Sequence, residues 1–145
     1  MAVTFTNNWK NILDKLESIL ETEFKGALPV YKGKDIPKGV NQALQLIPTG
    51  SVLTEYNTTS ETREFSATVR YIFADANVNE RALDHILRQV SRIEALIHDN
   101  VAMTLSDSTR AFNCRFDSTD LNTDDESGIY VTEWAWKCLH LGNTG

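Results

Sequence analysis

Two stretches of the chain repeat apolar residues at the three- and four-residue spacing of an amphipathic helix. The first stretch covers residues 7–25, and Gly26 can end it in a left-handed conformation. The second begins after Asn77, which together with Glu80 resembles a capping box, and it continues for about 20 residues. Its apolar positions are Ala82, Leu83, Ile86, Val90, Ile93, Leu96 and Ile97. The pattern therefore predicts two helices that each bury one face.

Much of the remaining chain shows the two-residue alternation of β-strands, in runs separated by polar turns. The clearest run is REFSATVRYIFA, which begins at Arg63 and places its apolar residues on one face. Before it come LPVY, then QALQLIP and SVLTEYN, which a turn at Thr49–Gly50 separates. We therefore predict one α+β domain over residues 1–145, with an antiparallel sheet of about four to six strands and two helices packed on one face. The predicted order is α-β-β-β-β-α-β-β.

Two further strand-like runs, AFNCRF and IYVTEWAWKCLHL, enclose the acidic stretch DLNTDDESG at residues 120–128. This stretch has oxygen-bearing side chains at the first, third and fifth positions, as a calcium-binding EF-hand loop does. However, Asp125 stands where that loop needs glycine, and Val131 stands where it needs a bidentate glutamate. Strands rather than helices also flank it. We therefore interpret the stretch as the solvated or partner-facing tip of a long hairpin, and we predict no metal site there.

The two cysteines lie in the two strands of this hairpin. If residues 118–127 close the hairpin, Cys114 faces Val131 and Cys138 lies elsewhere along the pair. The cysteines are then not opposite one another, so we predict two free, buried thiols and synthesis in a reducing compartment.

The last strand leaves two interpretations open. Strict alternation from Val131 would place Trp134 and Trp136 on the outer face. Either a β-bulge near Thr132–Glu133 reverses the faces and buries both tryptophans, or the strand has two covered faces and the tryptophans pack against another subunit.

The chain carries a net charge of −6, which argues against a general nucleic-acid binder because such proteins present a basic face. It does not argue against a protein through which DNA passes. The start of the sequence has no basic segment followed by an apolar core, so we expect no secretory signal. We also expect no membrane span, since no apolar run approaches the ~20 residues that one requires.

Candidate chemistry is sparse. The three histidines, His85, His98 and His140, are far apart, and the sequence contains no H-E-x-x-H, C-x-x-C, G-x-S-x-G or glycine-rich dinucleotide turn. In KGKDIPKG, Gly33 and Gly39 are one residue too far apart for a phosphate-binding P-loop. We therefore predict no catalytic residue, no metal and no cofactor, and we interpret KGKDIPKG as a surface loop whose lysines can meet an acidic partner.

The order of the elements resembles the tail-terminator, or tail-completion, proteins of long-tailed bacteriophages. The resemblance covers nearly the full chain, through NNWKNILDKL, PVYKG, ALQLIP, REFSATVRYIFA, NERALDHILRQVSRIEALI and IYVTEWAWKCLHL. It implies a virion structural protein without catalysis, made in the host cytoplasm and placed at the tail–neck junction. Its hexameric ring would cap the tail tube protein, end tail elongation and join a head-closure or neck connector protein. DNA would be only passing cargo in the lumen, which suits an acidic chain.

Two other functions remain as alternatives: another neck or head–tail connector protein, and a small ligand-binding module or enzyme with a pocket between helices and sheet.

A ring of this kind would use the polar loops and the two tryptophans as contact surfaces. The candidate interface residues are Lys32, Lys34, Lys38, Thr58, Ser60, Glu61, Asp120, Asp124, Asp125, Glu126, Trp134 and Trp136. We hypothesise that the basic loop meets the acidic tip of a neighbouring subunit. Reversing the charges of Lys34 and Lys38 should then weaken the ring in sedimentation experiments.

Overall fold

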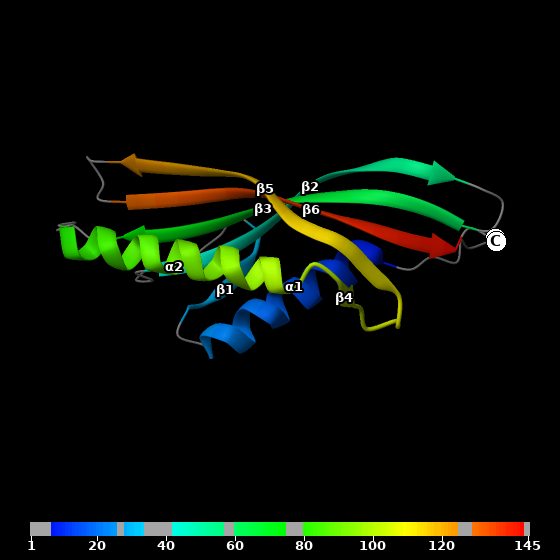
Figure 1. Ribbon diagram of the computed structural model, residues 1–145, viewed down its shortest axis with the longest axis horizontal. Coiled ribbons are helices and arrows are strands. Elements are labelled where there is room, and N and C mark those ends of the chain that lie inside the picture. Colours follow the sequence, from blue (N-terminus) through cyan, green and yellow to red (C-terminus); the bar gives the residue numbers. More distant parts are fainter. Residues whose placement is uncertain are drawn as a thin grey trace.

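The computed structural model describes residues 7–25, 28–33, 42–56, 60–74, 80–124 and 129–143. The elements follow in the order α1 (Asn8–Phe24), β1 (Val30–Lys32), β2 (Gln42–Tyr56), β3 (Ser60–Ala74), α2 (Glu80–Asp99), β4 (Met103–Thr104), β5 (Arg110–Asp124) and β6 (Ile129–Asn143). They form an elongated, twisted six-stranded sheet with both helices on the same side (Figure 1). The predicted α+β fold class is confirmed.

Local capping sets the ends of helix α1. The Asn7 side chain accepts a hydrogen bond from the backbone N–H of Lys10 at 3.1 Å, which satisfies one of the free donors of the first turn. At the other end Lys25 adopts a left-handed φ of 51°, and its N–H donates to the carbonyl of Glu21. The left-handed position is therefore Lys25, one residue earlier than predicted, and Gly26 lies outside the described residues.

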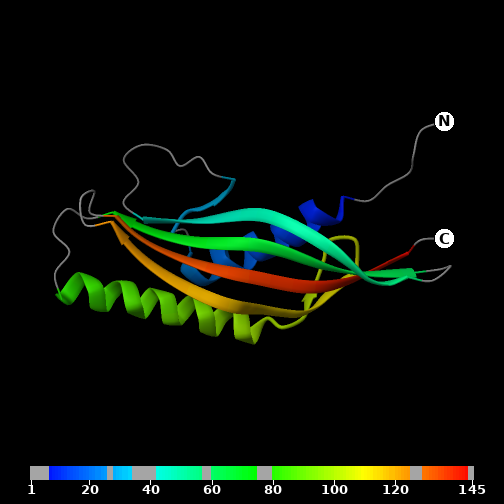
Figure 2. The same ribbon diagram turned by 90° about the horizontal axis from the view of Figure 1, so that it is seen from above.

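The sheet has the strand order β1-β2-β3-β6-β5-β4, and among the described strands only the β1–β2 pair is parallel. Strands β3 and β6 pair without interruption along their whole length (Figure 2). The two runs predicted as separate strands form the single strand β2, so the predicted turn at Thr49–Gly50 was wrong. The chain instead passes through a register shift between Pro48 and Gly50 and continues in the same direction.

The terminal hairpin is tighter than predicted. Strand β5 continues to Asp124, which pairs with Ile129, so residues 118–127 do not form the closing loop. Asn122 faces Val131 in place of Cys114. The polar composition concealed this strand because residues 118–121 are exposed, which lets their side chains stay in water while the backbone pairs.

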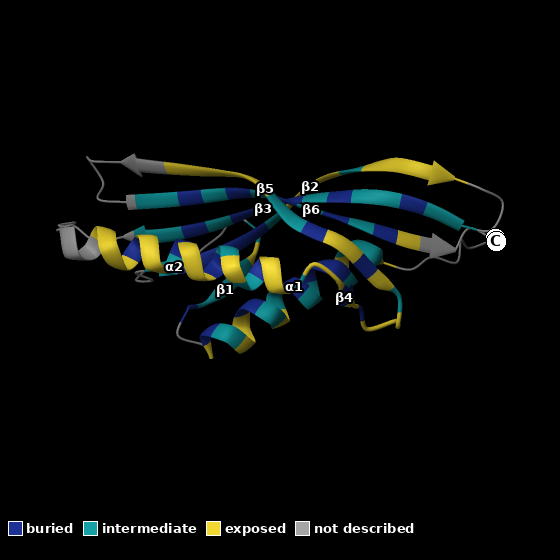
Figure 3. Cartoon of the chain, in the orientation of Figure 1, coloured by how far each residue is buried: buried dark blue, intermediate teal, exposed yellow. Residues whose placement is uncertain are grey.

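The core lies between the helices and the face of the sheet that they cover (Figure 3). Trp134 and Trp136 are each only 1% exposed and belong to this core. Strand β6 needs no bulge to bury them, because its even-numbered residues face the helices and Val131 faces the other side. The helices contribute the buried side chains Ile12, Leu13, Leu16, Leu20, Phe24, Ile86, Val90, Ile93 and Ile97.

Candidate assembly surfaces

Both borders of the sheet are covered over short lengths. Strand β1 pairs with β2 only over Leu44–Leu46, and β4 pairs with β5 only over Arg110–Ala111. Within the described part of the chain, no strand pairs with the outer side of β2 over residues 47–56 or of β5 over residues 115–124. We call these two stretches the free edges. In Figure 1 they lie toward opposite ends of the molecule, with β2 at the right and β5 at the left. Such edges are templates for pairing with another chain.

The sheet face that the helices do not cover, here called the open face, carries cross-strand ion pairs. Arg70 of β3 pairs with Glu133 of β6 at 2.6 Å. A second group of four charges joins three neighbouring strands, and its members are Glu64, Lys137, Arg115 and Asp117. The paired side chains are about one third exposed, between 26% and 35%. The open face is therefore polar, ordered by opposite charges, and accessible to a partner.

Large exposed apolar side chains gather toward the two ends of the sheet. By the strand register, Val52, Leu53, Tyr56, Phe112 and Leu141 lie toward the β2–β3 hairpin, and Leu121 lies toward the opposite end, with Leu83 and Leu87 in the first half of α2 and Val101 just after α2. The first group comes from β2, β5 and β6, whereas the second comes from α2, the residues just after it and the far end of β5. They therefore give the molecule two unlike ends, as head-to-tail association requires.

The predicted contact residues fall into different environments. Ser60 and Glu61 begin β3, where the Glu61 carboxylate lies 3.5 Å from Arg63 Nε. Asp120 is exposed on β5, opposite Glu133, and the backbone of Asp124 ends that strand. Outside the described residues lie Lys34, Lys38, Thr58, Asp125 and Glu126. The hypothesis that the basic loop meets the acidic tip therefore stays a prediction.

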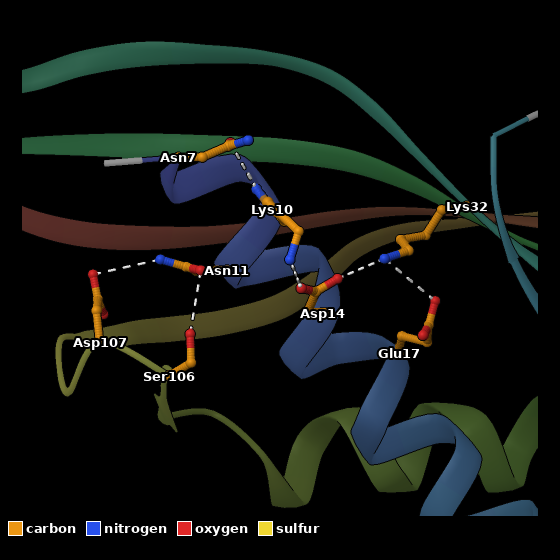
Figure 4. Close-up of polar contacts among 8 residues, drawn as sticks. All are labelled: Asn7, Lys10, Asn11, Asp14, Glu17, Lys32, Ser106 and Asp107. Carbon is orange, nitrogen blue, oxygen red and sulfur yellow. Dashed lines mark hydrogen bonds and ion pairs between the residues drawn. The ribbon is translucent and has the colours of Figure 1, made fainter. Parts of the chain in front are cut away.

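Lys32 uses its charge within the chain. Its ammonium group contacts Asp14 and lies 3.7 Å from Glu17, and Asp14 also pairs with Lys10 (Figure 4). The hydrogen bond from Lys32 holds the pKa of Asp14 below its ordinary value, and the same bond raises the pKa of Lys32. These contacts fasten β1 to α1, so a neighbouring subunit that bound Lys32 would have to compete with two carboxylates.

Asn11 connects helix α1 to the segment between β4 and β5. Its side-chain oxygen lies 3.2 Å from the Ser106 hydroxyl, and its amide donates to Asp107 at 3.5 Å (Figure 4). Helix α1 is thus connected to chain segments from both borders of the sheet, β1 on one side and the β4–β5 segment on the other. These contacts hold β1 and the β4–β5 segment, which border the two free edges, in place against helix α1.

Strand β5 has a bulge at Asn113–Cys114, where two residues oppose the single residue Cys138 of β6. Asn113 has a φ of 54°, in the left-handed region that asparagine tolerates better than most residues. The bulge turns Cys114 toward the helix side, where Cys138 also lies, and both thiols are buried and free. Free, buried thiols were predicted correctly, but the predicted separation of the two cysteines was wrong, because the hairpin closes beyond Asp124 and this register brings Cys114 beside Cys138.

The remaining titratable groups do not converge on one place. Among the described residues, no three histidine, cysteine, aspartate or glutamate side chains are grouped so that they could hold a metal ion. Burial raises the pKa of Tyr71 to about 12, and its hydroxyl donates to Gln42 Oε1 at 2.9 Å. Tyr71 therefore has a structural contact in the core and stays protonated at neutral pH.

A small groove of about 220 Å³ lies between α2 and β5. Polar side chains make up most of its lining, which consists of Glu94, Ile97, His98, Arg115, Phe116, Asp117, Ser118 and Thr119. Pockets for small organic ligands are usually larger, roughly 300–1,000 Å³, and mostly apolar. This groove consequently gives little support to the ligand-binding alternative. Neither helix, over its described residues, is long and apolar enough to cross a membrane.

Comparison with known proteins found a match in structure but none in sequence. No family model matches the sequence, and no curated protein sequence matches it. Among solved structures, a chain from the virion of a native gene transfer agent (GTA) particle superposes with a TM-score of 0.61 at 11% identity. The match covers 90% of this chain and 98% of that chain. The two chains therefore share their fold over nearly their whole length.

Proposed function

We propose that the protein is a virion structural protein that assembles into a ring, caps the tail tube, ends its growth and joins it to a neck protein on the head side. The fold shared with a chain of a gene transfer agent virion supports this proposal, as does the resemblance of the element order to tail terminators. The observation that carries it is the pair of free edges. A head-to-tail ring needs two different surfaces on each copy, and the free edges provide them.

Strand directions permit the two edges to join. The four long strands lie in the order β2-β3-β6-β5 and are all antiparallel to their neighbours. Since their number is even, β5 runs opposite to β2. A second copy placed with its β2 beside β5 of the first would therefore continue the same antiparallel alternation, and so would every further copy.

The positions of the edges also favour closure. Leu46, Val69, Trp134 and Thr119 form one row across the sheet. Thr119 lies in the middle of the free edge of β5, whereas Leu46 immediately precedes the free edge of β2. Bringing the two edges together requires a shift of about six residues along the strands, or ~20 Å. Over four strands, ~19 Å wide, this shift inclines the strands by about 45°, close to the 35–45° tilt of closed barrels.

Apolar side chains next to the edges would supply contact energy beyond the backbone hydrogen bonds. Val52 is 61% exposed and Tyr56 is 68% exposed, and both lie on the free edge of β2. Burying a large apolar side chain fully contributes roughly 1.5–3 kcal/mol, whereas an exposed ion pair contributes roughly 0–1 kcal/mol. The apolar residues of the edge are therefore the stronger candidates for the contact.

The first experiment is to measure the oligomeric state of the purified protein by light scattering and negative-stain imaging over a range of concentrations, with and without tail tubes. Closed rings that bind to the ends of tubes and stop their growth support the proposal. Rings that bind only a head-side connector would instead favour a different neck protein. A monomer at all concentrations that ignores tubes would refute the assembly function.

A matched pair of variants tests the edges themselves. Val52→Lys combined with Leu53→Lys adds two charges to the free edge of β2, where lysine blocks strand addition. We expect ring formation to weaken at least tenfold in concentration while the unfolding midpoint hardly changes, because both side chains are already exposed. The control is Ser18→Lys combined with Thr22→Lys, which adds the same two charges at exposed positions of helix α1, outside both free edges. Equal weakening by the control would show a general charge effect and contradict the edge contact.

A further inference from the structure

The bulge in β5 has a chemical consequence that assembly does not use. It places Cys114 beside Cys138, at positions only 1% and 0% exposed. Without the bulge, alternation would direct Cys114 to the open face, away from its partner. A left-handed asparagine, Asn113, maintains this arrangement.

The two thiols are electrostatically unequal. The hydrogen bond from the Cys138 thiol lowers the pKa of Cys114, and the nearby Arg115 guanidinium lowers it further. The same contact with Cys114, together with burial, raises the pKa of Cys138. Because the thiolate is the reactive form of cysteine, Cys114 is the better nucleophile and Cys138 holds its proton until a later step.

An irregular segment borders the edge of β5 at Cys114. Its backbone N–H donates to the carbonyl of Val101 at 2.8 Å, in the segment between α2 and β5. This segment contains only the two-residue strand β4, and both Val101 and Ala102 are exposed. Met103 and Leu105 of this segment are buried in the core, so local opening is confined to Val101 and Ala102. Opening there would admit a small molecule beside Cys114 without unfolding the sheet.

We propose that Cys114 and Cys138 form an oxidative modification site, at which a small external disulfide such as oxidised glutathione closes a cross-strand disulfide between β5 and β6. The thiolate sulfur of Cys114 attacks one sulfur of the external disulfide, whose S–S bond breaks and releases the first thiol. Cys138 then gives up its proton, and its sulfur attacks Cys114 Sγ and releases the second thiol. The two protein thiols are oxidised, and one external disulfide is reduced to two thiols.

The test is to treat the fully reduced, folded protein with oxidised glutathione at neutral pH and to measure its intact mass. We expect the loss of two hydrogen atoms, a proteolytic fragment that joins the two cysteines, and a thermal midpoint higher by roughly 5–10 °C. A reducing agent should reverse all three changes. A glutathione adduct that persists on the wild-type protein would overturn the proposal. So would an unreacted native protein under conditions in which the urea-unfolded chain reacts.

Single variants distinguish the attacking thiol, Cys114, from the resolving thiol, Cys138. Cys138→Ala lacks the resolving thiol, so it should accumulate the glutathione adduct on Cys114. Cys114→Ala should react at least tenfold more slowly, because Cys138 is completely buried and remains protonated. Equal rates for the two variants would contradict the assigned order of attack. The wild-type mass measurement stands even if one variant folds poorly.

Discussion

Neighbouring residues of β6 lie in opposite environments. Trp134 and Trp136 are buried beneath the helices, whereas Glu133 and Lys137 form ion pairs on the open face. The strand is regular through this region, so alternation alone separates the two sets. One face of the sheet therefore contributes apolar burial to the fold, and the other contributes charge and access to solvent.

This contrast distinguishes the face that stabilises the fold from the face that is available for contacts. Burial of large side chains contributes several times more free energy than exposed charge pairs do. The helix-covered face must then hold the monomer together, while the open face and the free edges can change with little cost to the fold. Variants on the helix-covered face should therefore lower the stability of the monomer, whereas variants on the open face should mainly change assembly.

The largest effect is expected on the helix-covered face. Trp136→Ala removes a completely buried indole from the core and should lower the free energy of unfolding by about 3–5 kcal/mol, measured by urea denaturation. The control is Thr68→Ala, which removes a half-buried side chain from the open face of β3. If Trp136→Ala left the monomer stable but abolished the ring, the tryptophan would be an assembly residue and the separation of the two faces would fail.

The two tryptophans also allow a sharper test within the same face. Trp134 Nε1 donates to Glu94 Oε1 at 3.4 Å, whereas Trp136 Nε1 is buried without a hydrogen-bond partner among the described residues. Replacement by phenylalanine deletes a bonded donor in one case and an unbonded donor in the other. Trp134→Phe should therefore cost about 1 kcal/mol more than Trp136→Phe.

The sequence predicted both helices and strand β3 because each has an unbroken apolar pattern of one period. It could not predict the faces of β6, since Val131 and Trp134 suggest opposite parities and only the pairing with β3 decides between them. The bulge at Asn113–Cys114 was also hidden. An extra residue changes the register by one, and nothing in the composition of AFNCRF indicates it.

The free edges were beyond sequence reasoning for another reason. An edge is defined by the absence of a neighbouring strand, and the apolar pattern does not show that β1 and β4 cover β2 and β5 over only three and two residues. The predicted contacts were therefore placed in loops, several of which lie outside the described residues, whereas the structure directs attention to residues 47–56 and 115–124.

An intermediate effect is expected at His140, a polar residue buried on the helix-covered face. Its ring nitrogen Nε2 lies 3.0 Å from the Thr109 hydroxyl, and Phe65 packs against its edge. Burial lowers the pKa of His140 below its usual 6.5, although the charges of Asp107 and Glu61 oppose this shift. The unfolded chain then binds a proton more readily than the folded protein does, so stability falls as the pH drops below 6.5.

The variant His140→Gln tests how much of the pH dependence of stability comes from His140. At neutral pH the variant should lose about 1 kcal/mol, since its contact with Thr109 is altered. Between pH 7 and about 5, however, urea unfolding should show a smaller further loss for the variant than for the wild-type protein. Parallel pH profiles for the two proteins would mean that His140 is protonated equally in the folded and unfolded states.

The smallest effect on stability is expected on the open face. Glu133→Gln removes one charge from the pair with Arg70, whose side chains are 34% and 31% exposed. Because water and salt screen pairs of this exposure, the variant should lose no more than about 1 kcal/mol, and added salt should reduce the difference. Gln45 lies 3.5 Å from the same guanidinium and can keep part of its hydrogen bonding. A loss as large as that of Trp136→Ala, or one independent of salt, would show that the open face also holds the fold. The charges there would then belong to the stability of the monomer, and assembly would have to rely on the free edges alone.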